Sequence, residues 1–432
     1  MHDEAERRAG FAEVFAVGEF RALWLSNLLS RVGDQLARVA LAVIAYDRTG
    51  SAALTALLYS LTFVPALLGG PLLAGFADRH PRREVMIVCD VARTGLIALM
   101  AVPHMPFAAL GALLFTAQLL DSPENAARTA TTPVVLTADR YTIGLSALAM
   151  TTQTAGLAGF AVGGVLVAAT GAPLALVLDA ASFALSAAIV ALGVRSRPAA
   201  AKESAGQALS AAASGKGPNK GRAPSAIRVV AADPLLRAIL GLALLAGFYV
   251  VPEALAVPYA AEAHLGTRAA GLLMAALPTG NVLGIALLNR FAGPSTRLRL
   301  FGPLALITSL PLLLCAARPG LVLSMVLWAA TGLLSSYQVI ANAAFARAVP
   351  DRVRGRALGL AGSLLTAAQG LGMILAGVAA GRLDPAHAIA WAAGAGSVAG
   401  LPAAWAWRRA RTAPTRPAGQ RAVEPVTPAA EG

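Results

Sequence analysis

The chain has 432 residues, of which 57% are hydrophobic and only 13% are charged. Soluble globular domains carry about 25% charged residues, so this composition excludes a water-soluble enzyme, and the sparse charge excludes disorder over most of the length. A net charge of +13 can indicate nucleic-acid binding, but the basic residues are scattered through short connectors, so we expect no nucleic acid as partner. Apolar runs near the ~20 residues that cross a bilayer recur throughout and predict a multi-pass membrane protein.

No metal, redox or nucleotide site is indicated by the sequence. Cys89 and Cys315 lie in separate apolar segments, and the five histidines fall at termini or segment ends. There is neither a CxxC pair nor a phosphate-binding Walker loop. No Ser/His/Asp or paired-carboxylate constellation can be assembled on one membrane face, so we expect no cofactor, no metal and no enzymatic activity.

The apolar runs predict about twelve spanning helices. The first contains Arg31, Asp34 and Arg38 and is too long for a cleaved signal peptide, so we expect it to be retained. A short turn at Gly171 separates the fifth span from the sixth. The predicted spans cover residues 20–46, 52–74, 84–103, 106–124, 143–169, 172–194, 235–259, 268–289, 299–316, 320–345, 356–380 and 386–407.

A stretch rich in Ala, Ser, Gly, Lys and Pro, residues 196–224, divides the chain and predicts a flexible linker. The predicted organisation has five parts. They are a cytoplasmic N-terminal segment at 1–19, a six-helix bundle at 20–194, a cytoplasmic linker at 195–234, a second six-helix bundle at 235–407, and a disordered cytoplasmic tail at 408–432.

Basic residues alternate between connectors in a way that predicts the topology. The connectors on one side, together with both termini, hold nearly all of the arginines and lysines, whereas the opposite connectors hold only Arg48, Arg268, Arg318 and Arg382. Cytoplasmic loops carry an excess of Lys and Arg, so both termini are expected in the cytoplasm, in a multi-pass protein of the cell membrane.

The run AGFADRHPRR at residues 74–83 resembles the loop between helices 2 and 3 of the major facilitator superfamily. Ala74 stands where the signature has its first Gly, and Phe76 and Pro81 replace a Leu and the second Gly. The resemblance covers nearly the whole chain. It implies an all-α membrane protein with twelve transmembrane helices in two pseudo-symmetric six-helix bundles, working as a secondary transporter.

Further runs resemble the drug-exporter branch of that family, which includes macrolide and enterobactin exporters. They are RVGD at 31–34, LDAASF at 178–183 and PDRVRGR at 350–356. The run GFAVGG at 159–164 is similar to the antiporter motif Gly-Pro-x-x-Gly-Gly, with Phe160 in place of the Pro. The resemblance implies proton-coupled efflux.

Charges inside a membrane are costly, so each one needs an explanation. Arg31 and Arg38 lie three residues before and four after Asp34, on one face of the first helix. Two hypotheses remain open: a self-neutralised ionic stripe that orients the helix, or a protonatable carboxylate whose charge is exchanged with the arginines.

Two other acids lie within predicted spans. Glu253 follows Pro252 without a basic residue one turn away, so it is either solvated at a helix end or carries a proton. Asp179 has no local partner, and both a packing or capping role and a substrate contact stay open. Asp34 and Glu253 are the predicted proton-coupling residues.

The loop after the second span predicts a cytoplasmic gate built from Asp78, Arg79, Arg82 and Arg83. The arginines also satisfy the positive-inside rule, whereas the resemblance implies that Asp78 pairs with the end of helix 11. Asp121, Glu124 and Arg128 at the end of the fourth span are candidate gate partners, although Glu124 and Arg128 are four residues apart and can equally pair with each other.

Uncharged polar residues within spans are the candidates for a substrate cavity: Gln153, Asn281, Gln338 and Gln369. Most such residues form interhelical hydrogen bonds. An otherwise apolar wall suits a hydrophobic or amphipathic solute better than a sugar.

The favoured hypothesis is efflux of a drug or natural product against proton entry, by a monomer in the lipid bilayer. The alternatives are an importer or facilitator of a small metabolite, and a non-transporting sensor on the same fold.

Overall fold

The computed structural model describes residues 11–65, 79–136, 138–198, 226–350 and 353–412, and these residues fold into helices joined by short turns. The loop signature up to Asp78, most of the predicted linker and the predicted tail beyond residue 412 lie outside the described residues. The helices of the first half are α1 (Phe11–Phe15), α2 (Gly18–Thr49), α3 (Ala52–Ser60), α5 (Arg82–Met100), α6 (Phe107–Leu119), α7 (Asp121–Val135), α8 (Ala138–Thr170) and α9 (Ala172–Gly193).

The second half begins after the predicted linker and repeats the pattern of long helices. Its elements are α11 (Ala226–Ala232), α12 (Pro234–Leu244), α13 (Ala246–Tyr249), α14 (Val251–Glu262), α15 (Gly266–Phe291), α16 (Pro294–Ile307), α17 (Leu310–Leu313), a 3₁₀ turn (Leu314–Ala317), α18 (Leu321–Ser335), α19 (Tyr337–Ala348), α20 (Arg354–Leu383) and α21 (Pro385–Thr412). Within the described residues, seven helical segments are long and apolar enough to cross a membrane.

Several predicted spans are helices with a local break. The seventh consists of α12, α13 and α14, and Pro252 lies just after the second break, where its missing N–H cannot continue the helical ladder. The fourth predicted span, 106–124, contains α6 and the first turn of α7, and helix continues beyond it to Val135. In α7, Glu124 and Arg128 are each only 3% exposed and pair with each other.

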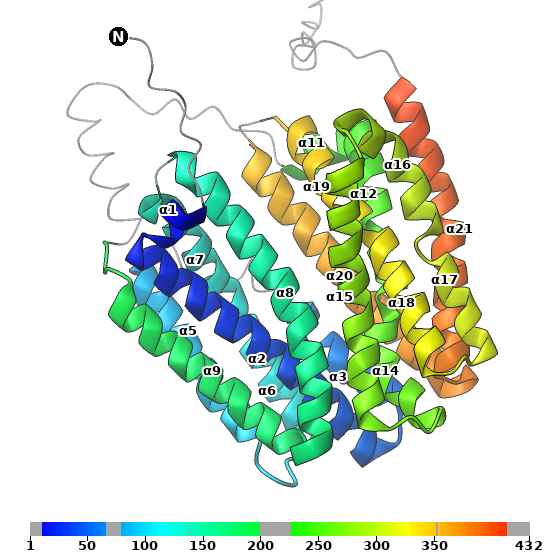
Figure 1. The fold of residues 1–432 in the computed structure, drawn as a ribbon, viewed down its shortest axis with the longest axis horizontal. Coiled ribbons are helices and arrows are strands. Elements are labelled where there is room, and N and C mark those ends of the chain that lie inside the picture. The colour runs from blue at the N-terminus through cyan, green and yellow to red at the C-terminus, as the bar shows by residue number, and fades with distance from the viewer. Residues whose placement is uncertain (1–10, 66–78, 137, 199–225, 351–352, 413–432) are drawn as a thin grey trace, which may run out of the picture.

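The helices form two bundles (Figure 1). In the first, α2 packs against α8 and α9, and α5 packs against α9. In the second, α15 packs against α18, while α21 contacts α12, α16 and α20. The bundles meet where α8 lies along α15, where α3 reaches across to α20 and α14, and where α2 touches α14. We refer to the end that carries Gly18 and Thr412 as the termini end, and to the opposite end as the far end.

The outward faces of both bundles expose large apolar side chains. Leu192 is 90% exposed, Phe291 78%, Val322 76% and Trp391 68%. Isolated exposed apolar residues are ordinary on any protein, but a surface this rich in Leu, Val, Phe and Trp would aggregate in water. The exposed surface therefore fits a hydrocarbon environment, as the composition predicted.

At the far end, Asp384 caps the junction between α20 and α21. Its Oδ1 accepts a hydrogen bond from the backbone N–H of His387 at 3.0 Å, and its Oδ2 lies 2.8 Å from an Arg318 guanidinium nitrogen. Burial raises the pKa of Asp384, but the bonds from His387 and Arg318 more than offset this and hold it below its ordinary value. Its backbone φ of 101° lies in the left-handed region, where Asp and Asn are among the few tolerated side chains.

We predict that Asp384→Ala destabilises the protein by about 1 kcal/mol, because Ala provides no N-cap. Asp384→Asn is the matched control and retains most of the stability, since Asn caps equally well and tolerates positive φ.

The stability that Asp384 contributes should also depend on pH. Because its folded pKa lies below the unfolded one, the carboxylate contributes stability above its ordinary pKa, and this contribution is lost as the pH falls through the folded value. Thermal unfolding in detergent measures these effects; equal midpoints for the Ala and Asn variants would contradict the cap.

Candidate functional site

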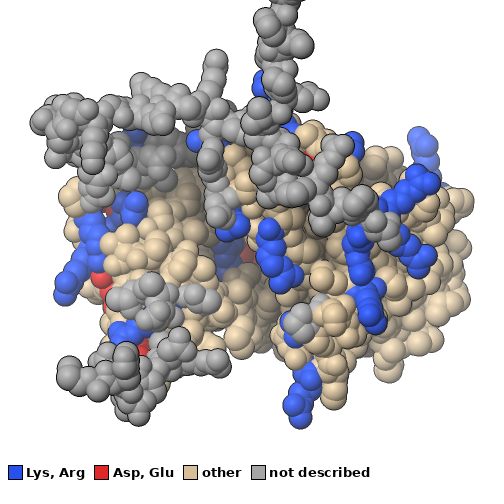
Figure 2. Space-filling model, turned by 90° about the horizontal axis from the view of Figure 1, so that it is seen from above, with Lys and Arg blue, Asp and Glu red and all other residues tan. Residues whose placement is uncertain are grey.

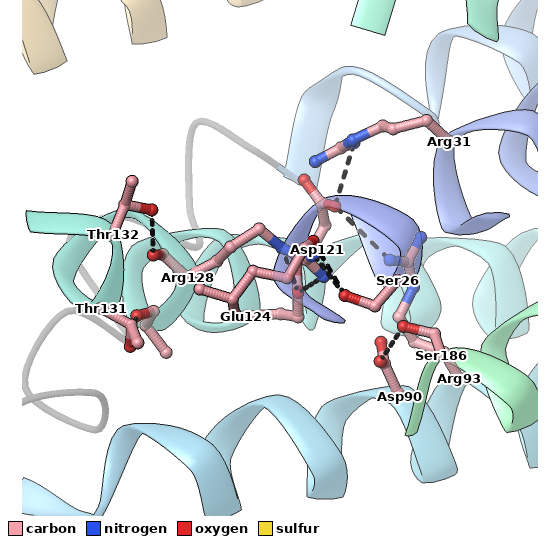
Figure 3. A network of polar contacts seen from close by, with 12 residues as sticks. Ser26, Arg31, Asp90, Arg93, Asp121, Glu124, Arg128, Thr131, Thr132 and Ser186 are labelled. Atoms are coloured by element: carbon pink, nitrogen blue, oxygen red, sulfur yellow. Dashed lines mark hydrogen bonds and ion pairs between the residues drawn. The ribbon is translucent and has the colours of Figure 1, made fainter. Parts of the chain in front are cut away.

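A buried ionic network lies in the middle of the first bundle (Figure 3). Asp34 of α2 is 6% exposed and accepts a hydrogen bond from Arg93 of α5, with 2.8 Å between Oδ1 and the guanidinium nitrogen. Asp121, at the start of α7, lies 3.3 Å from Arg31 and 3.4 Å from Arg93. Two guanidinium groups therefore balance two carboxylates where helices α2, α5 and α7 meet.

Arg93 is the central residue of this network, whereas its spacing of three residues from Asp90 indicates only a structural pair within α5. Its guanidinium is 1% exposed and lies over the ring of Phe183 in α9, with 4.0 Å from Cζ to the ring centroid. The ring supports the cation from one side while Asp34 and Asp121 approach its N–H groups. Arg93 thus joins α2, α5, α7 and α9, and its pairing with Asp34 spans 59 residues of sequence.

Of the two arginines expected to flank Asp34, only Arg31 belongs to the network. It lies 3.7 Å from Asp34, further than Arg93 does. Arg38 turns away toward the ring of Phe63, at 5.1 Å from the centroid. The predicted pairing of Asp34 with Arg31 is therefore present, that with Arg38 is replaced by the contact of Arg38 with Phe63, and Arg93 of another helix approaches Asp34 more closely than Arg31 does.

Glu253 lies at the junction of the two bundles. The hydroxyl of Tyr59 in α3 donates a hydrogen bond to Glu253 Oε2 of α14 at 3.3 Å. Glu253 is half-buried and interacts electrostatically with Arg38 of α2. Glu253 lies in the first turn of α14, and its side chain faces the other bundle.

A second polar bridge joins α8 to α15. The amide of Gln153 donates to Asn281 Oδ1 at 2.7 Å, and the Asn281 amide donates in turn to Ser335 of α18 at 2.9 Å. By contrast, Gln338 donates to the carbonyl of Ala243 inside the second bundle. Gln369 is half-buried on α20. Two of the four cavity candidates are thus brought together at the bundle junction.

Glycines allow the bundles to touch near the far end. A Cβ on Gly164 of α8 would lie 2.4 Å from the Cα of Gly271 in α15, so neither position can accept a side chain without separating the helices. On the other face of α8, Gly159 and Gly163 lie against α2. The antiporter-like run 159–164 therefore forms a smooth surface that lets α8 pack between α2 and α15.

The predicted gate residues fall into three groups. Asp78 lies outside the described residues, and Arg79 is exposed. Arg82 donates to the carbonyl of Ala130 at 3.0 Å, and Arg83 donates to that of Ala191, so both anchor the start of α5 within the first bundle.

The third group lies at the α6–α7 junction, where Glu124 and Arg128 are buried and Asp121 is partly exposed. Glu124 pairs with Arg128, which also donates to Ser26 Oγ and to the carbonyl of Leu23, both at 2.8 Å (Figure 3). Local pairing of Glu124 with Arg128 is confirmed, and Asp121 belongs to the network around Asp34 instead.

The two ends of the molecule differ in charge. Figure 2 looks onto the termini end, where blue side chains are spread over a face that is hollowed between the bundles. Exposed arginines at or near that end include Arg79, Arg195, Arg237, Arg290, Arg299, Arg347, Arg356 and Arg408.

Deeper in the first bundle, a narrow cavity is lined by Asp34, Arg38, Thr62, Gln118 and Asp179, among others.

Metal chemistry finds no support in the part of the chain that the structure describes. No group of three or more His, Cys, Asp or Glu side chains is arranged there to hold a metal ion, and Cys89 and Cys315 are buried free thiols.

Two bundles of long apolar helices, joined at a junction that carries polar bridges, define a polytopic membrane transporter of the secondary type. The sequence profile of the Major Facilitator Superfamily matches residues 23–321. The chain therefore belongs to the major facilitator superfamily, as the loop signature predicted, and is a transporter rather than an enzyme. Among curated proteins, none matches this sequence.

Solved structures share the fold at low sequence identity. A bacterial homologue of the human lysosomal transporter Spinster, in an inward-facing and unoccupied conformation, superposes with a TM-score of 0.71 at 16% identity over 94% of this chain and 100% of that chain. The POT family transporter PepTSo gives 0.72 at 12% identity, over 92% and 99%. An inward-facing bacterial homologue of the iron transporter ferroportin gives 0.65 at 16%, over 94% and 100%.

We predict that Arg93→Met destabilises the protein by about 3–5 kcal/mol, because it leaves buried carboxylates without their cation. Arg140→Met is the matched control: its pair with Glu13 at 3.5 Å is between side chains 40% and 48% exposed, so its loss costs at most about 1 kcal/mol. Unfolding in mild detergent, followed by circular dichroism, compares the two variants. An Arg93 variant as stable as the Arg140 variant would contradict a stabilising role for the network.

Proposed function

We propose that this transporter exports a hydrophobic or amphipathic small molecule in exchange for protons, by alternating access of the two bundles. The observation that carries the proposal is the hydrogen bond between Tyr59 and Glu253, which places a titratable carboxyl group on the contact that must break when the bundles rearrange. A proton that arrives at or leaves Glu253 changes its charge next to Arg38, and hence changes the energy of that contact.

Asp34 is the second proposed proton-coupling residue. In the conformation seen it lies 2.8 Å from Arg93 and 3.7 Å from Arg31. A rearrangement that draws Arg93 away would leave the carboxylate without its closest cation and favour proton uptake. We propose that exchange of this ion pair accompanies the transport cycle.

Closure at the far end supports an arrangement open toward the termini end. Gly164 touches Gly271, Gly377 lies against Ala56, and the Tyr59–Glu253 bond lies in the same half of the molecule. The exposed arginines of the termini end support a cytoplasmic location for that end by the positive-inside rule. We propose that Asp78, Arg79, Arg82 and Arg83 form the cytoplasmic gate that closes in the opposite state.

An amphipathic cargo is supported by the chemistry of the junction. Gln153 and Asn281 supply a few hydrogen-bonding groups among apolar walls, which suits a solute with limited polar surface. The structurally similar proteins are named for different cargoes, and a shared fold does not determine cargo.

Transport measurements in vesicles separate this proposal from its two alternatives. Accumulation of the solute in the direction of import would favour an importer, and absence of any flux would favour a non-transporting sensor.

A disulfide across the far end should lock the bundles together. A Cβ on Gly381 of α20 would lie 3.8 Å from the Cβ of Ala53 in α3, which is the usual Cβ separation of a disulfide. We expect A53C/G381C, in a background in which Cys89 and Cys315 are replaced by Ala, to cross-link on oxidation and to stop ethidium transport in vesicles. Reduction should restore transport, and each single variant is a control. Cross-linked protein that transports at the rate of the reduced form would contradict alternating access at this contact.

Glu253→Gln should abolish ethidium accumulation driven by a pH gradient in inverted membrane vesicles, because the neutral amide cannot release a proton. Glu262→Gln on the same helix is the matched control and should transport normally, since Glu262 is exposed outside the junction. The same loss is expected from Asp34→Asn. Proton-driven accumulation at the unmodified rate in Glu253→Gln would remove this carboxyl from the mechanism.

A further inference from the structure

Asp179 of α9 is a fully buried carboxyl group with incomplete hydrogen bonding. It is 0% exposed, its Oδ1 accepts a weak bond from Ser182 at 3.4 Å, and its Oδ2 has no hydrogen-bond partner. The backbone of α2 presses against it, because a Cβ on Gly33 would lie 2.3 Å from Asp179 Oδ1. The fold thus encloses this carboxyl group without giving it an ion pair among the described residues.

The arginines near Asp179 are already paired with other carboxylates, so Asp179 has no cation of its own among the described residues. Arg31 and Arg93 already balance Asp34 and Asp121 through the four ion pairs described above. The charged neighbours of Asp179 are Asp34, which repels its ionised form, and Arg93, which is engaged elsewhere. An ionised carboxylate that is buried without its own cation is strongly disfavoured, so the neutral acid is the form that this arrangement accommodates.

Other titratable groups packed against α9 do not change this balance. Arg38 lines the same cavity but lies against the ring of Phe63. Asp90 of α5 accepts a hydrogen bond from Ser186 of α9 at 2.6 Å and is likewise 0% exposed, with its Oδ1 unpartnered. Asp90 and Asp179 are therefore two similar buried acids at the packed surface of α9. Ser186, which binds Asp90, lies about two helical turns beyond Asp179.

The narrow cavity distinguishes these two acids. Asp179 lines it together with Asp34, Arg38, Thr62 and Gln118, whereas Asp90 does not. Asp179 therefore combines an unpartnered carboxyl oxygen with a place on the wall of a small polar cavity that it shares with Asp34 and Arg38.

We propose that Asp179 is a proton-carrying residue of the first bundle, which holds a proton in the conformation seen and releases it when Arg93 pairs with it. On release the O–H bond of Asp179 breaks, the proton passes to water in the cavity, and the carboxylate takes Arg93 as its counter-ion. Arg93 is placed for this exchange: its Nε has no hydrogen-bond partner, and its guanidinium lies on Phe183, one turn beyond Asp179 in α9. The proposal rests on the proposed proton-coupled transport and adds a third carboxyl group to it.

The first test compares Asp179→Asn with Asp90→Asn, using ethidium in inverted vesicles. Asp179→Asn should lose accumulation driven by a pH gradient but keep ethidium movement down its own gradient and keep its unfolding temperature, whereas Asp90→Asn should retain all three. Replacing sodium by choline should leave accumulation unchanged, and dependence on sodium would overturn the assignment to a proton. Normal proton-driven accumulation in Asp179→Asn would overturn the proposal.

The second test observes the proton directly and does not depend on transport. Infrared spectra of the purified protein near neutral pH should contain protonated-carboxyl absorption that shifts in D₂O, with a component band that is lost in Asp179→Asn and remains in Asp90→Asn. Ser182→Ala should shift this band by removing its hydrogen bond, whereas Ser186→Ala should not. This serine pair decides the question even if Asp179→Asn fails to fold, and a spectrum that neither serine variant nor Asp179→Asn changes would overturn the proposal.

The two tests separate the failure of this inference from the failure of the proposed function. If the unmodified protein shows no proton-driven accumulation, proton-coupled export is wrong, and the infrared band still decides whether Asp179 is protonated. If the unmodified protein and Asp179→Asn both accumulate ethidium equally, proton-coupled export stands and only the role of Asp179 is wrong.

Discussion

The cost of placing charge in a low-dielectric interior governs the arrangement of the first bundle. Arg93 cannot be buried alone, and neither can Asp34 or Asp121, so the chain brings three helices together until each cation meets a carboxylate. Phe183 completes the enclosure from a fourth helix. The helix packing and the charge pairing therefore depend on one another, and a change at either would disturb both.

The junction between the bundles uses two kinds of contact. Near the far end, Gly164 and Gly271 bring backbones together without side chains, a contact that can separate without leaving buried polar groups unpaired. The bridges Tyr59–Glu253 and Gln153–Asn281 are polar, and their energy depends on protonation or on an alternative partner. A smooth apolar contact combined with a few exchangeable polar bridges suits a junction that opens and closes.

Membership of the major facilitator superfamily explains the architecture but does not identify the transported molecule, which depends on particular side chains. Structures of the same fold are named for Spinster, for peptide transport and for ferroportin, at 12–16% identity to this chain. A shared fold does not determine the cargo, which depends on the side chains that form the walls of the junction. In this chain those walls carry amides and a tyrosine among apolar residues.

Properties that follow from local composition could be predicted from the sequence. Apolar runs located the long helices, because a helix that crosses a bilayer needs about 20 mostly apolar residues in a row. Gly171 marked the turn between α8 and α9, where its φ is 87°. The pairing of Glu124 with Arg128 was also predictable, since i and i+4 lie on one helical face.

Partnerships between distant helices were decided only by the tertiary structure. The contact of Asp34 with Arg93 was not predicted because Arg93 is 59 residues away, and the burial of Glu124 and Arg128 depends on helices that local spacing does not reveal. The contact of Glu253 with Tyr59 and the isolation of Asp179 likewise depend on which helices meet. Helix periodicity is a local property of the chain, whereas the pairing of buried charges depends on packing across the whole bundle.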